Sequence, residues 1–126
     1  MAARGRGTIV NIGSMYGTVA APNRAGYCAT KSAVDMLTRV LAVEWAPLGL
    51  RVNAVAPGYV RTALLEELIQ QGRVDADALI ARTPARRFGT VEEVAELTHF
   101  LASDAASFIN GQVVGLDGGW TANGYL

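Results

Sequence analysis

Residues 8–56 read TIVNIGSMYGTVAAPNRAGYCATKSAVDMLTRVLAVEWAPLGLRVNAVA, and this stretch decides the fold. It begins with a β-rich run at residues 8–13 that ends at a glycine, and it closes with a second β-rich run at residues 51–56. Between them, apolar residues recur at helical spacing from residue 27 to about residue 48. A strand, a long helix and a second strand form the repeating unit of a parallel sheet, so the stretch predicts an α/β fold.

The long helix is apolar on nearly all of its faces. One face carries Val34, Leu37, Leu41, Trp45 and Leu48, and the others carry Ala33, Met36, Val40 and Val43. Such a helix needs cover from the sheet on one side and from something else on the other. Asp35 and Arg39 are spaced to form an i,i+4 ion pair, and Gly49 is suited to close the helix.

The elements after residue 56 continue the α/β alternation. Two short helices are expected, at Leu64–Gln71 and Asp75–Arg82, with Gly72 between them. The spacing of Thr90 and Glu93 is that of a capping box, which opens a helix running to about residue 103. A third strand is expected at residues 112–117. Ligands in open parallel sheets bind beyond the carboxyl ends of the strands, so the residues after Gly13, Ala56 and Asp117 are the candidates for a site.

Composition limits the possible partners of the chain. Its 126 residues are 51% hydrophobic, which suits one domain spanning residues 1–126. Eleven basic residues balance eleven acidic ones, so neither nucleic acid nor an anionic membrane is an expected partner. One cysteine, Cys28, and one histidine, His99, cannot build a disulfide framework or a Cys/His zinc site, so no metal is expected. No apolar run approaches the roughly 20 residues of a membrane helix, and a cytoplasmic location is expected.

Three side chains point to proton transfer at the end of the first strand. Ser14 follows that strand directly, and Tyr27 and Lys31 share one face at the start of the long helix. A phenol in water has a pKa of about 10, and a neighbouring ammonium favours its ionised form. The trio therefore fits a general acid/base beside a hydroxyl that holds a substrate oxygen. Taken singly, a Tyr and a Lys four positions apart are in most cases only a surface pair, and a Ser after a strand is usually a turn residue.

At this point the chain resembles the short-chain dehydrogenase/reductase family, in a combination of motifs that spans residues 5–119. The motifs are Gly13-Ser14-Met-Tyr-Gly17, Tyr27-x-x-x-Lys31, Arg51-Val-Asn53, Pro57-Gly-x-Val-x-Thr62, Arg87-Phe-Gly89, Glu93-Val94-Ala95, Gly111-Gln112 and Asp117-Gly-Gly119. The resemblance implies hydride transfer between a nicotinamide cofactor, NAD or NADP, and a secondary alcohol or ketone. Polyols, sugar acids and 3-oxoacyl thioesters are the substrate classes left open.

The resemblance also implies roles for particular residues. Tyr27 would be the general acid/base, Lys31 its electrostatic partner, and Ser14 the hydroxyl that orients the substrate. The cofactor would be contacted by Tyr27, Lys31, Pro57, Gly58, Val60 and Thr62. The substrate pocket would be walled by Ser14, Met15, Tyr16 and Tyr59, together with the segment 64–68.

The family's glycine-rich fingerprint is not found in the sequence, which predicts that the amino-terminal half of the domain is absent. The expected fold is a partial Rossmann-like, doubly wound parallel sheet of about three strands with flanking helices. Members of the family commonly form dimers and tetramers, so a homo-oligomer is expected, with Trp120, Tyr125 and Leu126 near a subunit contact. The isolated chain is expected to be marginally stable and inactive, and the alternative function is that of a non-catalytic remnant that binds partner subunits.

Overall fold

Three parallel strands form the centre of the protein, in a computed structural model that describes residues 1–124. The strands are β1 (Gly7–Ile12), β2 (Leu50–Pro57) and β3 (Val113–Leu116), and they lie in the order β1-β2-β3. Val10 is paired with Asn53, and Ala54 with Val113. The strands lie where the sequence predicts them, with ends that differ by one residue at most.

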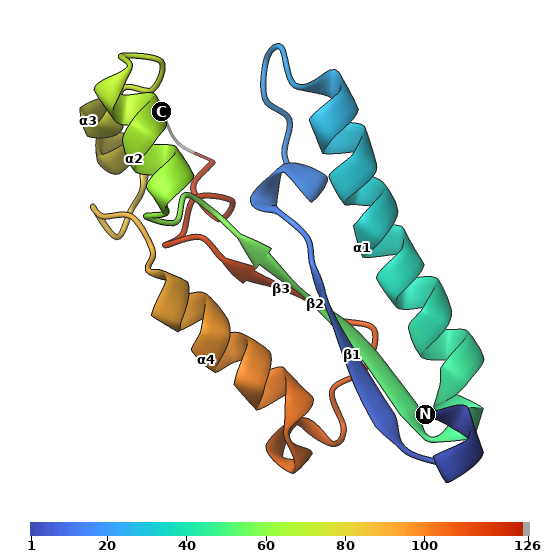
Figure 1. The fold of residues 1–126 in the computed structure, drawn as a ribbon. Helices are drawn as coiled ribbons and strands as arrows, with labels where there is room; N and C mark the ends of the chain where they lie inside the picture. The colour runs from blue at the N-terminus through green and yellow to red at the C-terminus, as the bar shows by residue number, and fades with distance from the viewer. Residues whose placement is uncertain (125–126) are drawn as a thin grey trace.

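Helices cover both faces of the sheet. The long helix α1 (Ala25–Trp45) lies along one face and α4 (Val91–Ala102) along the other, while α2 (Ala63–Gln70) and α3 (Ala76–Arg82) lie beyond the carboxyl end of β2 (Figure 1). The short 3-10 turns are η1 (Ala2–Arg4), η2 (Met15–Gly17), η3 (Ala46–Leu48) and η4 (Asp104–Ala106). Gly49 closes the end of the long helical segment with a φ of 73°, as predicted.

The core is centred on β2, which has helices on both sides. Val52, Ala54 and Val55 are fully buried, and Leu101 of α4 and Ala42 of α1 pack near them. Asn53 is also fully buried, because its amide bridges two backbone groups of the segment that leads into β3. Its Nδ2 donates to the carbonyl of Ile109 at 2.9 Å, and its Oδ1 accepts from the backbone N–H of Gln112 at 3.0 Å.

The predicted ion pair between Asp35 and Arg39 is wrong. The Asp35 side chain is only 4% exposed and turns toward Gly13 and Gly17, where a Cβ would lie within 3 Å of a carboxylate oxygen. Its Oδ1 has no hydrogen-bond partner among residues 1–124. Burial raises the pKa of the Asp35 carboxyl, while the charges of Arg39 and Lys31 act in the opposite direction. The Asp35 side chain fills the space beside Gly13 and Gly17, which have no side chains. Helical spacing in the sequence does not show that this space exists.

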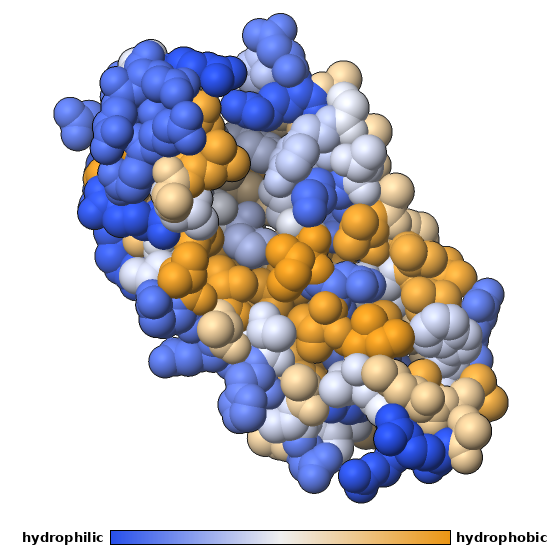
Figure 2. All heavy atoms as spheres, in the orientation of Figure 1, coloured by the Kyte–Doolittle hydropathy of each residue, from blue (hydrophilic) through white to orange (hydrophobic). Residues whose placement is uncertain are grey.

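The outer face of α1 and one edge of β1 are open in the described structure. Five large apolar side chains of the long helical segment are exposed, at Met36, Leu37, Val40, Val43 and Leu48. Within residues 1–124, β1 pairs with β2 alone. Figure 2 shows an apolar band that crosses the face of the molecule between α4 and α1. The residues of α1 that are buried are Asp35, Thr38 and Ala42, and the second cover predicted for the helix stays a prediction. None of the described helices is long and apolar enough to cross a membrane.

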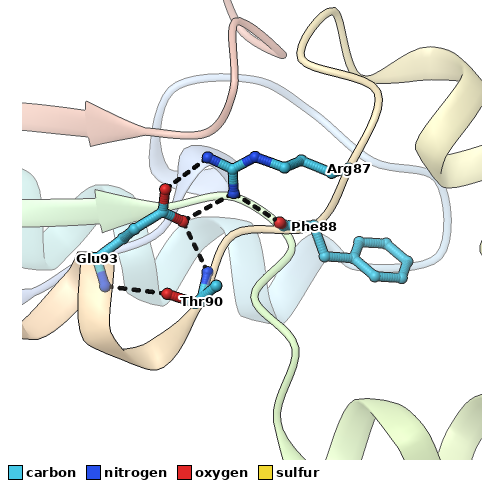
Figure 3. Close-up of polar contacts among 4 residues, drawn as sticks. All are labelled: Arg87, Phe88, Thr90 and Glu93. Carbon is cyan, nitrogen blue, oxygen red and sulfur yellow. Dashed lines mark hydrogen bonds and ion pairs between the residues drawn. The ribbon is translucent and has the colours of Figure 1, made fainter.

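The predicted capping box at the start of α4 is confirmed (Figure 3). The Thr90 hydroxyl accepts from the backbone N–H of Glu93 at 3.2 Å, and the Glu93 carboxylate accepts from the backbone N–H of Thr90 at 2.8 Å. Arg87 adds two hydrogen bonds to the same carboxylate and donates to the carbonyl of Phe88. The Arg87 guanidinium and the Thr90 N–H hold the pKa of Glu93 at about 2, below its ordinary value of 4.5.

We expect the contribution of Glu93 to stability to disappear in acid. A carboxyl whose pKa is lowered by folding stabilises the fold above its unfolded pKa, and it loses that effect as the pH falls through the folded value. The difference in urea midpoint between the parent protein and Glu93→Gln should therefore be constant above about pH 5.5. It should shrink between pH 4.5 and about pH 2. A difference that stays constant down to pH 2.5 would contradict this role.

Candidate active site

One cavity of about 540 Å³ lies at the carboxyl ends of β1 and β2 and opens between α2 and the first turns of α1 (Figure 2). Its volume is within the range of small-molecule sites. It is lined by all of the candidate residues from the sequence: Ser14, Met15, Tyr16, Tyr27, Lys31, Pro57, Gly58, Tyr59, Val60 and Thr62. The fold therefore brings together residues that are up to 48 positions apart, and the roles given to them remain predictions.

Ser14 is placed by the end of β1. The strand stops at Ile12, and the next residue, Gly13, donates its backbone N–H to the carbonyl of Val55 at 2.8 Å. Ser14 then caps the short turn η2, where its Oγ accepts from the backbone N–H of Tyr16 at 3.2 Å. The side chain is buried, with only 6% of the residue exposed. Because Oγ acts as an acceptor in the turn, its own proton is free to be donated to a ligand.

Tyr27 and Lys31 lie one turn apart near the start of α1. The Lys31 Nζ is 5.8 Å from the centre of the Tyr27 ring, and it donates to the carbonyl of Ile12 at 3.0 Å. Tyr27 is 44% exposed, and its ring meets Tyr16 edge-on at 6.4 Å. Among residues 1–124, no hydrogen bond joins the side chains of Ser14, Tyr27 and Lys31 to one another. The three side chains line one cavity, so a ligand bound there can contact all of them.

The loop after β2 is held by backbone contacts. Gly58 donates to the carbonyl of Leu116 at 2.9 Å, and a Cβ at this position would lie 2.8 Å from the Cα of Asp117. Only glycine fits that approach between two chain segments. Farther along, Tyr59 and Gly89 are joined by a backbone hydrogen bond of 2.9 Å. Thr62 begins α2 by accepting from the N–H of Leu65 at 3.2 Å, so its hydroxyl proton is also free.

An aromatic wall connects the serine turn to the loop after β2. The hydroxyls of Tyr16 and Tyr59 are 2.8 Å apart and share a hydrogen bond. Burial and this hydrogen bond raise the pKa of the Tyr16 phenol, while the nearby Arg24 guanidinium acts to lower it. Trp120 lies against Tyr59, with ring centres 5.3 Å apart, and also stacks with Arg82. Trp120 therefore contacts its own chain, and the other residues predicted at a subunit contact, Tyr125 and Leu126, lie outside the described residues.

The sequence analysis missed five residues that line the cavity: Ile12, Arg24, Val74, Val91 and Val94. Arg24 precedes Tyr27 by three positions, and that helical spacing was a usable signal. Val91 and Val94 come from α4, and no local pattern connects them to Ser14, Tyr27 and Lys31, which lie at least 60 positions earlier. Within the part of the chain that the structure describes, no group of three His, Cys, Asp or Glu residues is placed to hold a metal ion.

Comparisons with known proteins find relatives of this chain. A family model described as enoyl-(acyl carrier protein) reductase matches residues 1–121. The chain is 47% identical to a gluconate 5-dehydrogenase of Gluconobacter oxydans, over 98% of the chain and 48% of the relative. It is 46% identical to a tropinone reductase homolog of Arabidopsis thaliana, over 98% of the chain and 46% of the relative. The chain thus spans about half the length of the curated relatives it matches.

A solved structure shares the fold as well as the sequence pattern. It is a gluconate 5-dehydrogenase from Burkholderia cenocepacia in complex with NADP and tartrate. The TM-score is 0.89 and the identity 44%, over 97% of this chain and 48% of that one. The three-stranded sheet with its flanking helices therefore corresponds to about half of a larger Rossmann-type domain in that protein.

Proposed function

Because the chain belongs to the short-chain dehydrogenase/reductase family, we propose that its protein transfers a hydride between a nicotinamide dinucleotide and a secondary alcohol or ketone. The observation that carries the proposal is the shared cavity of Ser14, Tyr27 and Lys31 at the carboxyl ends of β1 and β2. Ligands bind at this edge of parallel α/β sheets. The relatives named above include a gluconate dehydrogenase, which supports a polar, multi-hydroxylated or acidic substrate.

Tyr27 and Ser14 are proposed to act on the substrate oxygen. The Ser14 hydroxyl proton is free, so it can hold that oxygen by a hydrogen bond in the buried part of the cavity. Tyr27 then takes the proton from an alcohol, or gives one to a ketone, as the hydride leaves or reaches the carbon. Its partial exposure leaves the phenol accessible to a ligand that enters the cavity.

Lys31 is proposed to serve both Tyr27 and the cofactor. One of its three N–H groups is used on the carbonyl of Ile12, which leaves two donors for ligand hydroxyls or for the phenol. Pro57, Gly58 and Val60 line the same cavity as these donors, and so does Thr62, whose hydroxyl proton is free. This donor set fits the ribose and nicotinamide end of NAD or NADP. A bound nicotinamide cofactor would supply the acceptor or donor of the hydride.

The test is an assay of the purified protein, in a form that also supplies the amino-terminal half predicted to be absent from this chain, with NAD and with NADP on a panel of secondary alcohols that includes polyols, sugar acids and 3-hydroxyacyl thioesters. We expect turnover with at least one cofactor, seen as a change in the absorbance of reduced nicotinamide. Fluorescence titration with NADH and NADPH measures binding independently. Absence of both turnover and binding would overturn the proposal and favour the alternative, a non-catalytic module that binds partner subunits.

We also propose a reducing cytoplasmic location, because the one cysteine of the chain, Cys28, is a free thiol.

The protein is further proposed to form a homo-oligomer through the outer face of α1. Val43 is 77% exposed on that face, so Val43→Lys should place a charge in the contact. Burying a valine side chain contributes about 1.5–3 kcal/mol, and we expect association to weaken by roughly tenfold or more. Multi-angle light scattering over a dilution series measures the effect. Phe108→Lys, at a fully exposed apolar residue outside α1, is the matched control and should leave the mass unchanged. A parent protein that is monomeric at micromolar concentration would contradict the proposal.

A further inference from the structure

The cavity has an unbalanced set of charges. Among the described residues that line it, two are cations, Arg24 and Lys31, and none is an aspartate or a glutamate. The other polar side chains that face it are the hydroxyls of serine, threonine and tyrosine, which can all donate hydrogen bonds. A cavity that offers positive charge and donors, without a carboxylate, favours a ligand with a negatively charged acceptor.

Arg24 is the cation of this cavity that has no partner. Lys31 already donates to the carbonyl of Ile12, whereas the Arg24 guanidinium makes no hydrogen bond and no ion pair among residues 1–124. Its charge nevertheless acts on the site, because it opposes the rise in the pKa of the Tyr16 phenol. Arg24 stands immediately before α1, three positions from Tyr27, and such neighbours have Cβ atoms roughly 5–6 Å apart.

The pair of Tyr16 and Tyr59 supplies a further donor. Their hydroxyls are 2.8 Å apart, and one of them donates to the other. The hydroxyl that accepts keeps its own proton, which is then free for a third group. Because the pKa of Tyr16 is raised, its phenol stays protonated at neutral pH and the donor is retained. Both tyrosines line the cavity that Arg24 also lines, so the guanidinium and the free hydroxyl can meet one ligand group.

From this juxtaposition we infer that the cavity recognises a carboxylate on the substrate, held by Arg24 and by the Tyr16–Tyr59 hydroxyl pair. The substrate class is a hydroxy carboxylic acid, or the corresponding oxo acid, whose carboxylate is several bonds away from the reacting carbon at Tyr27. The inference rests on the proposed function, and it names the substrate class of that same site. Arginine suits this task because its planar guanidinium can donate two parallel hydrogen bonds to a carboxylate.

The test compares an acid with a neutral molecule of the same shape. The probes are 4-hydroxycyclohexanecarboxylate and its primary amide, assayed with the parent protein, Arg24→Gln, Arg24→Lys and Tyr16→Phe. We expect the parent protein to prefer the acid. Arg24→Gln should raise KM for the acid by about 10- to 100-fold, the size expected for losing hydrogen bonds to a charged group, and should leave kcat/KM for the amide within about twofold. Arg24→Lys should restore part of the preference, and Tyr16→Phe should lose a smaller part of it.

Two controls separate this effect from others. Arg39→Gln removes a positive charge from a distant part of α1 and should leave the acid-to-amide preference unchanged. The inhibition constant of cyclohexanecarboxylate, which has no hydroxyl to oxidise, reports carboxylate binding without turnover, and it should rise in Arg24→Gln in parallel with KM for the acid.

The outcomes distinguish failure of the inference from failure of the proposed function. If the parent protein turns over the amide as well as the acid and Arg24→Gln changes both equally, the carboxylate site is wrong and the dehydrogenase function stands. If Arg24→Gln raises KM for the dinucleotide alone, the guanidinium binds a cofactor phosphate and the inference is overturned. If neither probe nor any alcohol of the panel is turned over with NAD or NADP, the proposed function fails and the inference fails with it.

Discussion

Tyr27→Phe should lower kcat on a secondary alcohol by about 10²- to 10⁴-fold, the range that general acid–base catalysis contributes. The substitution deletes one oxygen and leaves the ring, so the edge-on contact with Tyr16 and the position of Lys31 beside the ring are retained. The phenol makes no hydrogen bond within residues 1–124 that its loss would break. The loss of rate would therefore report proton transfer and not a disturbed fold. Steady-state kinetics at saturating cofactor, together with a thermal unfolding curve, measures both quantities.

Tyr16→Phe is the matched control for this experiment. It also removes one phenolic oxygen from the same cavity, but that oxygen is hydrogen bonded to Tyr59 and is assigned to binding. We expect Tyr16→Phe to act mainly on KM for acidic substrates and to leave kcat within about tenfold, since no proton transfer step depends on it. Should Tyr27→Phe retain kcat within tenfold of the parent protein, its assignment as the general acid/base would be wrong.

The largest expected effect on stability is that of Asn53→Ala. The Asn53 amide is fully buried and bonds the carbonyl of Ile109 and the N–H of Gln112. The Ile109 carbonyl also accepts from Arg51 at 3.2 Å, so the Gln112 N–H is the group that depends on Asn53. Leaving the Gln112 N–H without a partner costs about 1–3 kcal/mol, and the cavity left by the side chain and the lost bond to the Ile109 carbonyl add to that cost. A total loss of about 2–5 kcal/mol is a large share of the 5–15 kcal/mol typical of a domain. Urea or thermal unfolding measures the loss.

The control substitution is at Gln112, whose backbone N–H donates to the Asn53 side chain. Gln112→Ala removes an exposed side chain and keeps the backbone N–H that Asn53 accepts from, so it should change stability by no more than about 0.5 kcal/mol. Equal effects of Asn53→Ala and Gln112→Ala would show that the bridge does not stabilise the fold. Because β2 ends at Pro57 and leads directly into Gly58, we also expect Asn53→Ala to weaken cofactor binding.

Local sequence features determined the secondary structure and the centre of the candidate site. Strand and helix positions followed from hydrophobic period, and the ends of helices followed from Gly49 and from the Thr90–Glu93 capping box. These signals act over a few residues, so a sequence carries them without any tertiary contact. The spacing of Tyr27 and Lys31, together with the position of Ser14 after a strand, was likewise sufficient to place the trio at one edge of the sheet, because parallel strands align their carboxyl ends.

Only the tertiary structure decided which side chains from distant segments meet. The Tyr16–Tyr59 hydrogen bond joins residues 43 positions apart, and Asp35 is buried instead of paired with Arg39 because two glycines of another segment leave room for it. Arg24 became significant only when the cavity proved to contain no carboxylate among its described lining residues. Such facts depend on how whole elements pack. Helical and strand periodicity says which face of an element is apolar, but it does not say which polar groups that packing brings together or leaves without a partner.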